Sequence, residues 1–179
     1  VDKAMATRDV MVDRENLEKL FGRIVKGMAY ANGATNDDVV ELLKACGIHY
    51  ARTTISTESF DVPTDWLRMP TTCRHKNPRL MELAKEFVEY KQSEYIPGRR
   101  CLLFYLWGHS YEFPRDNNWN VIEEFASYVG GREDEIWYAT NIEIYNYVRA
   151  YDRLEWFVDM SGAHNPSSID VFVEINNKQ

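Results

Sequence analysis

Continuous apolar stretches alternate along the chain with segments in which apolar residues recur every three or four positions. The first pattern predicts strands and the second predicts amphipathic helices. Strands are expected at residues 24–31, 48–53, 101–107, 135–140, 155–160 and 170–176. Helices are expected at residues 13–22, 37–47, 78–91, 120–131 and 142–154. Because helical segments separate most of the strands, an α/β fold with parallel strands and crossover helices is predicted.

The most apolar segment, residues 101–107, predicts a strand in a sheet that is covered on both faces. Such sheets occur in doubly wound folds and in (β/α) barrels, where catalytic groups follow the carboxyl ends of strands. His109 follows this strand after Gly108, which is expected to turn the backbone sharply. His109 is therefore a candidate catalytic residue; the alternative is that it caps the strand and hydrogen-bonds a neighbouring loop.

Length, charge and cysteine content limit the classes of protein to which this chain could belong. The 179 residues predict a single domain spanning 1–179, and a net charge of -7 without basic clusters argues against nucleic-acid binding. The longest apolar run is too short to cross a membrane. Cys46 and Cys101 lie in apolar stretches and are expected to be buried thiols, which weakly favours a reducing, cytoplasmic compartment.

A long segment without regular periodicity, residues 54–76, is predicted to be a loop, and loops of this length are often functional. It contains His75, which is expected to be a surface histidine. The other histidines, His49, His109 and His164, are scattered along the sequence. They do not have the spacing of a metal site, so no metal ligands are predicted in this chain.

Three segments resemble polysaccharide deacetylases, the metal-dependent carbohydrate esterases of chitin- or peptidoglycan-like sugars. They are GMAYANG (27–33), DVPTDWLRMPTT (61–72) and LWGHSYEF (106–113). Residues 134–150 also resemble this family, and the resemblance extends over nearly all of residues 14–177. The first segment departs from the family pattern, because Ala31 occupies a position where proline is usual.

The resemblance implies a hydrolase that removes N-acetyl or O-acetyl groups from a carbohydrate by means of a metal-activated water. His109 would be the general acid and Asp65 its partner, since a neighbouring carboxylate favours the protonated imidazole. Trp66 would line the acetyl pocket. The remaining substrate-binding candidates are Tyr30, Arg52, Trp107 and Tyr111. The alternatives are a solvated carboxylate for Asp65 and a core residue for Trp66.

The metal-binding motifs of the family are absent from this sequence, which contains neither Asp-Asp-Gly nor a His-x-x-x-His pair. A zinc-like divalent metal is thus implied for the complete family domain, and none is predicted for this chain alone. The chain is expected to be the C-terminal two-thirds of an incomplete (β/α) barrel, lacking the first βα units. Its open sheet edges would favour a homodimer or pairing with a complementing N-terminal segment.

Three functional hypotheses follow from these patterns. The first is the deacetylase-like hydrolase acting on an acetylated glycan or amino sugar. The second is a non-catalytic carbohydrate-binding module with a groove formed by Trp66, Trp107, Tyr111 and Trp119. The third is an unrelated α/β domain that makes protein contacts. The third would require three ordered motif matches to be coincidental, so the first two are preferred.

Overall fold

The computed structural model describes residues 2–93 and 100–175, which belong to two compact units. The first unit comprises the described residues of 1–89 and 102–132, and the second those of 90–101 and 133–179. The prediction of a single domain over residues 1–179 remains a prediction. All the predicted site residues belong to the first unit.

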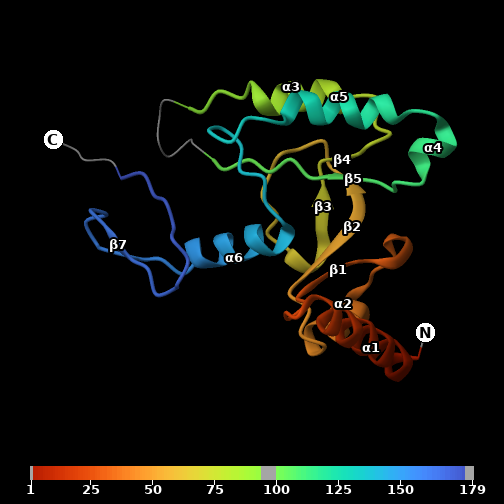
Figure 1. The fold of residues 1–179 in the computed structure, drawn as a ribbon. Coiled ribbons are helices and arrows are strands. Elements are labelled where there is room, and N and C mark those ends of the chain that lie inside the picture. The colour runs from red at the N-terminus through yellow and green to blue at the C-terminus, as the bar shows by residue number, and fades with distance from the viewer. Residues whose placement is uncertain (1, 94–99, 176–179) are drawn as a thin grey trace. The chain divides into compact units, whose positions relative to one another are not determined.

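The first unit contains parallel strands, with helices between most of them (Figure 1). The helices are α1 (Lys3–Phe21), α2 (Asp37–Ala45), α3 (Leu80–Val88), α4 (Glu112–Asp116) and α5 (Trp119–Val129), with the 3-10 helices η1 (Ala31–Gly33) and η2 (Trp66–Arg68). The strands are β1 (Gly27–Ala29), β2 (Tyr50–Ser56), β3 (Met69–Thr71), β4 (Cys73–Arg74) and β5 (Leu106–Trp107).

The strands pair in chain order. β2 lies between β1 and β3, β4 pairs with β5, and each of these pairs is parallel. Thr72 separates β3 from β4, and its hydroxyl donates to the Leu103 carbonyl and accepts from the Tyr105 amide. The predicted α/β fold with parallel strands is therefore confirmed. The strands of the described residues form no closed barrel.

Two apolar clusters support the first unit. One joins α2 to β2, and its buried residues are Tyr30, Val40, Leu43, Cys46, Ile48, Ala51 and Leu67. The other contains buried Phe60, Cys73, Leu80 and Leu83, with Phe104 and Phe125 packed against it. The helices α3 and α5 lie side by side over this second cluster (Figure 1). Burial of these apolar faces is the main stabilising contribution.

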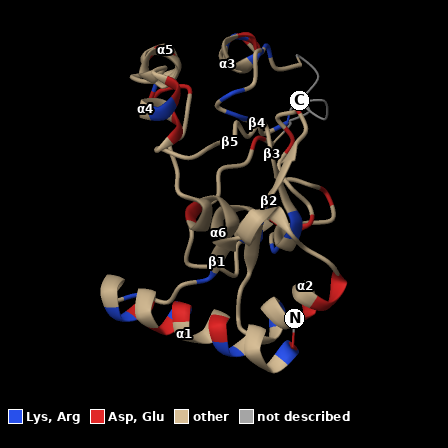
Figure 2. Ribbon diagram, turned by 90° about the vertical axis from the view of Figure 1, so that its right-hand side faces the viewer, with Lys and Arg blue, Asp and Glu red and all other residues tan. Residues whose placement is uncertain are grey.

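Helices were predicted more accurately than strands. The predicted helix at 13–22 is part of the longer α1, which begins at Lys3 because Asp2 accepts hydrogen bonds from the amides of Ala4 and Met5. Acidic and basic side chains are mixed along this helix (Figure 2). They include the ion pair of Arg14 with Glu18. Arg14 also donates to the Cys46 carbonyl, which attaches α1 to the end of α2.

Several strand predictions were wrong. The expected loop at 54–76 contains η2, β3 and β4, because pairing with distant segments stabilises strands too short to show a pattern. Only the last two residues of 101–107 form a strand, and residues 135–140 form none. Cys101 is exposed rather than buried, so it gives no support for a reducing compartment.

The second unit contains α6 (Asn141–Tyr151) and an antiparallel pair, β6 (Glu155–Trp156) with β7 (Ala163–His164). Thr140 and Glu143 form a capping box at the start of α6. The expected strand at 170–176 is not formed by residues 170–175, and Asn176 lies outside the described residues. None of the helices in the described ranges is long and apolar enough to span a membrane.

Candidate functional site

Four of the predicted site residues lie together at the end of β5. The guanidinium carbon of Arg52 is 4.6 Å from the centroid of the Trp107 ring. The ring of His109 is 5.9 Å from that of Trp107 and stacks on Tyr111 at 5.3 Å. We call Arg52, Trp107, His109 and Tyr111 the β5 edge. This edge combines exposed aromatic surface, a guanidinium and a titratable imidazole at the carboxyl end of a parallel strand.

The four residues of the β5 edge differ in how much they expose to solvent. Tyr111 is 59% exposed and His109 is also exposed, whereas Trp107 is half-buried. Arg74 is a second guanidinium near the Trp107 ring, at 5.3 Å from its centroid. One arginine, Arg115, lies over the Tyr111 ring at 5.6 Å from its centroid. Because Tyr111 is the more exposed of the two aromatic residues, it offers the more accessible aromatic surface for a ligand.

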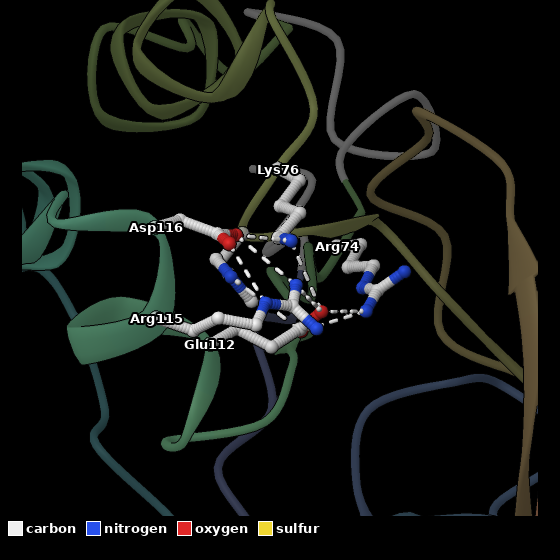
Figure 3. A network of polar contacts seen from close by, with 6 residues as sticks. Arg74, Lys76, Glu112, Arg115 and Asp116 are labelled. Atoms are coloured by element: carbon white, nitrogen blue, oxygen red, sulfur yellow. Dashed lines mark hydrogen bonds and ion pairs between the residues drawn. The ribbon is translucent and has the colours of Figure 1, made fainter.

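A network of ion pairs fixes the segment that carries His109 (Figure 3). Its centre is Glu112, which is 3% exposed and begins α4. Arg74 contacts both carboxylate oxygens of Glu112, at 2.5 and 2.6 Å, and Lys76 contacts one of them at 3.1 Å. Arg115 pairs with both Glu112 and Asp116, and Lys76 also pairs with Asp116. These five residues are the Glu112 network.

Both carboxylates of the network are ionised at neutral pH. Burial raises the pKa of Glu112, but the hydrogen bonds from Arg74 and Lys76 outweigh this effect and lower its pKa to about 2. Hydrogen bonds from Arg115 and Lys76 hold the pKa of Asp116 well below its usual range. The amide of Glu112 also donates to the carbonyl of His109 at 3.1 Å. The network therefore fixes the backbone turn that presents His109.

His75 was predicted to be a surface histidine, and this prediction was wrong. Its side chain is 2% exposed and its ring lies 4.6 Å from that of Phe113. Burial lowers the pKa of His75, while the charge of Glu112 raises it and those of Arg74 and Lys76 lower it. The net effect is a lowered pKa, so His75 is neutral at pH 7 and packs as a core residue.

Gly108 has a different role from the predicted one. It is not among the glycines with positive φ, so no unusual backbone turn requires a glycine there. A β-carbon at position 108 would instead lie 1.8 Å from Nδ1 of His75. The glycine is needed because the buried imidazole occupies the space that a larger residue would take.

The other three predicted site residues lie around η2. Tyr30 is 5% exposed and its hydroxyl donates to the Leu67 carbonyl at 2.6 Å. Asp65 accepts from the Leu67 amide and pairs with Arg68. Trp66 is half-buried on η2. Among the described residues, no hydrogen bond or ion pair joins Asp65 to His109, and the role of Asp65 as its partner remains a prediction.

The side chains near His109 do not fit a divalent metal. In the part of the chain that the structure describes, no three His, Cys, Asp or Glu side chains form a group that could hold one. Glu112 and Asp116 are both paired with basic side chains, whose charges would repel a cation. Burial raises the pKa of Cys73 to about 11, so this residue is a thiol rather than a thiolate ligand.

Comparisons of the chain with protein-family models, curated proteins and solved structures found no match. The resemblance to polysaccharide deacetylases accordingly rests on the sequence segments alone. Sequence reasoning missed the Glu112 network. Its residues are visible in the sequence as the basic residues of 74–76 and as the acidic residues Glu112 and Asp116, which follow the apolar segment 101–107. Their pairing depends on the alignment of β4 with β5, which the sequence pattern does not specify.

Proposed function

We propose that the chain provides the sugar-binding and proton-donating surface of a polysaccharide deacetylase-like hydrolase. The substrate class is an acetylated glycan or amino sugar. The observation that carries this proposal is the exposed stack of His109 and Tyr111 at the carboxyl end of β5. The chain-order pairing of parallel strands supports the finer fold proposal, an incomplete (β/α) barrel.

Each residue of the β5 edge has a specific part in this proposal. The apolar face of a sugar ring packs on Tyr111, as it commonly does on exposed aromatic side chains. His109, when protonated, gives its proton to the amine nitrogen that leaves as the carbon–nitrogen bond breaks. The Glu112 network fixes the backbone turn between His109 and Tyr111. In the complete family domain a divalent metal would activate the attacking water; the described residues of this chain do not fit one.

Glycan binding can be tested directly on the chain. A tetrasaccharide of N-acetylglucosamine should shift the amide resonances of residues 106–111 in an NMR titration. Tyr111→Ala should weaken the affinity about fivefold, because an aromatic contact is worth about 1 kcal/mol. Trp137→Ala is the matched control, since Trp137 is also an exposed aromatic residue, at 58%, but belongs to the second unit. Absence of any shift at 106–111 would exclude the proposed binding surface.

Acetate release distinguishes the hydrolase from its alternative, a non-catalytic carbohydrate-binding module. The ion pairs that occupy Glu112 and Asp116 favour the alternative. If the chain, supplied with zinc and with a complementing N-terminal segment that carries the metal motifs, releases acetate from the tetrasaccharide and His109→Gln abolishes the release, the hydrolase is supported. Binding without release by that combination supports the module. The predicted homodimer or complementing N-terminal segment remains a prediction, which light scattering of the purified chain would test.

A further inference from the structure

The β5 edge and the Glu112 network together concentrate positive charge on an otherwise acidic chain. The chain has a net charge of -7. Within the network, by contrast, the cations Arg74, Lys76 and Arg115 outnumber the carboxylates Glu112 and Asp116 by one. Arg52 adds a further positive charge beside Trp107. The local excess of cations therefore runs against the charge of the chain as a whole.

Arg52 is held in place without a neutralising partner. Its Nη1 donates to the Thr53 carbonyl at 3.1 Å, and its guanidinium lies over the Trp107 ring. Within residues 2–93 and 100–175, no carboxylate pairs with Arg52. A guanidinium has five N–H donors, so most of the hydrogen-bonding capacity of Arg52 remains available. Contact with an aromatic ring restricts its orientation and so prepares it for a ligand.

Two further donors beside Arg52 lack acceptors. Nε of Arg74 and Nε1 of Trp107 are buried and have no hydrogen-bond partner among the described residues. Buried polar groups are nearly always paired, and each unpaired one is unfavourable. Both donors lie at the Trp107 ring, which Arg52 and Arg74 contact. An oxygen-rich anion bound by the partly exposed Arg52 guanidinium would add an acceptor to this region, whereas a neutral apolar ligand would add none.

We propose that Arg52, supported by Arg74, binds the carboxylate of an acidic sugar unit in the glycan that packs on Tyr111. This inference rests on the proposed function and specifies its substrate class. A carboxylate matches the planar fork of a guanidinium, which can donate two parallel hydrogen bonds to it. The restricted position of Arg52 on Trp107 places this fork beside the aromatic surface. Discrimination between acidic and neutral glycans is therefore assigned to Arg52.

The test uses the full chain and two matched ligands. One is a tetrasaccharide that alternates N-acetylglucosamine with glucuronic acid, and the other is the same tetrasaccharide with its carboxylates reduced to alcohols. Calorimetric titration should show about tenfold tighter binding of the acidic form, the effect of one charge-assisted pair. Arg52→Gln should abolish this preference while binding of the reduced form persists. Arg52→Lys should keep part of the preference, because the charge remains and the fork is lost.

Lys44→Gln is the control for general charge effects, since it removes one cation from α2 that pairs with exposed Glu41. It should leave the preference unchanged. Equal affinity of the native chain for both ligands would overturn the assignment of Arg52 and leave the proposed glycan binding intact. If Lys44→Gln and Arg52→Gln reduce the preference for the acidic tetrasaccharide equally, the assignment of Arg52 is also overturned. Binding of neither ligand would overturn both the inference and the proposed function. A circular dichroism spectrum of each variant verifies that it is folded.

Discussion

The β5 edge and the segment around η2 both carry predicted site residues, but they use them in opposite ways. At the β5 edge, His109 and Tyr111 are exposed and stack on each other above a turn fixed by buried Glu112. Around η2, Tyr30 is buried and its hydroxyl is used to hold Leu67. A chemically suitable residue type therefore becomes available to a ligand only when other residues support the backbone that exposes it.

The two regions also differ in what stabilises them. Around η2 the contacts are a hydrogen bond from the Tyr30 hydroxyl, the N-cap formed by Asp65 and the exposed ion pair of Asp65 with Arg68. The β5 edge, by contrast, is supported by the Glu112 network, in which three cations converge on one buried carboxylate. Removing one charged residue from such a group leaves the other charges without a compensating partner, whereas exposed ion pairs contribute little to stability. Substitutions in the two regions should therefore have very different effects.

Glu112→Gln should give the largest loss of stability. The folded-state pKa of Glu112, about 2, lies below its ordinary value of 4.5, so its charge stabilises the fold above pH 4.5 and this contribution is lost as the pH falls toward 2. The difference in unfolding free energy between the native chain and the variant should be large at pH 7 and should shrink between pH 4.5 and 2. Urea unfolding at a series of pH values measures it.

Glu124→Gln serves as the control for that experiment, since Glu124 is an exposed acidic residue on α5. It should show no comparable pH-dependent difference from the native chain. A pH-independent effect of Glu112→Gln would contradict the electrostatic role of the network and indicate that Glu112 only fills space.

Gly108→Ala should give the next largest loss of unfolding free energy, about 1–3 kcal/mol, which is the usual cost of overpacking a core. The added methyl group would lie 1.8 Å from Nδ1 of His75, so the turn that carries His109 must move. The double variant Gly108→Ala with His75→Ala should be less destabilised than the sum of the single effects, because the clash is removed. Thermal and urea unfolding of the four proteins measure the coupling; strict additivity would show that the two residues do not interact.

Tyr30→Phe should destabilise the chain by about 1 kcal/mol, since it removes one buried hydrogen bond to Leu67. Its affinity for the N-acetylglucosamine tetrasaccharide should be unchanged, in contrast with Tyr111→Ala. Parallel unfolding and NMR titrations separate the two effects. Weaker glycan binding at unchanged stability would instead support the prediction that Tyr30 binds substrate.

Asp65→Asn should have the smallest effect. Asp65 is half-exposed and its ion pair with Arg68 lies at the surface, where such pairs add little to stability. Because Asp65 contacts the Leu67 amide and Arg68 rather than His109, the imidazole resonances of His109 should not move in the variant. A shift of those resonances would show that Asp65 acts as the partner of His109, as the family resemblance implies, and would join the two regions into one site.

Helical periodicity was a reliable guide because it reports local contacts. The expected helices at 37–47, 78–91, 120–131 and 142–154 correspond to α2, α3, α5 and α6, with small differences at their ends. The strands were less predictable. β3, β4 and β5 contain two or three residues each, and they exist through hydrogen bonds to partners that are distant in sequence.

The sequence alone determined most of the helices, the parallel α/β character and the position of His109 after an apolar segment; α4 and the first half of α1 were not predicted. These follow from side-chain periodicity and from the order of elements, which are local properties. Only the tertiary structure decided that His75 is buried, that Tyr30 serves the core, and that Arg74 meets Glu112. The position of Tyr30 depends on its packing against Leu67, which is 37 positions away. The contact of Arg74 with Glu112 depends on the register of β4 with β5, which places residues 38 positions apart within hydrogen-bonding distance. Register is set by packing between distant segments, and so it cannot be read from either segment alone.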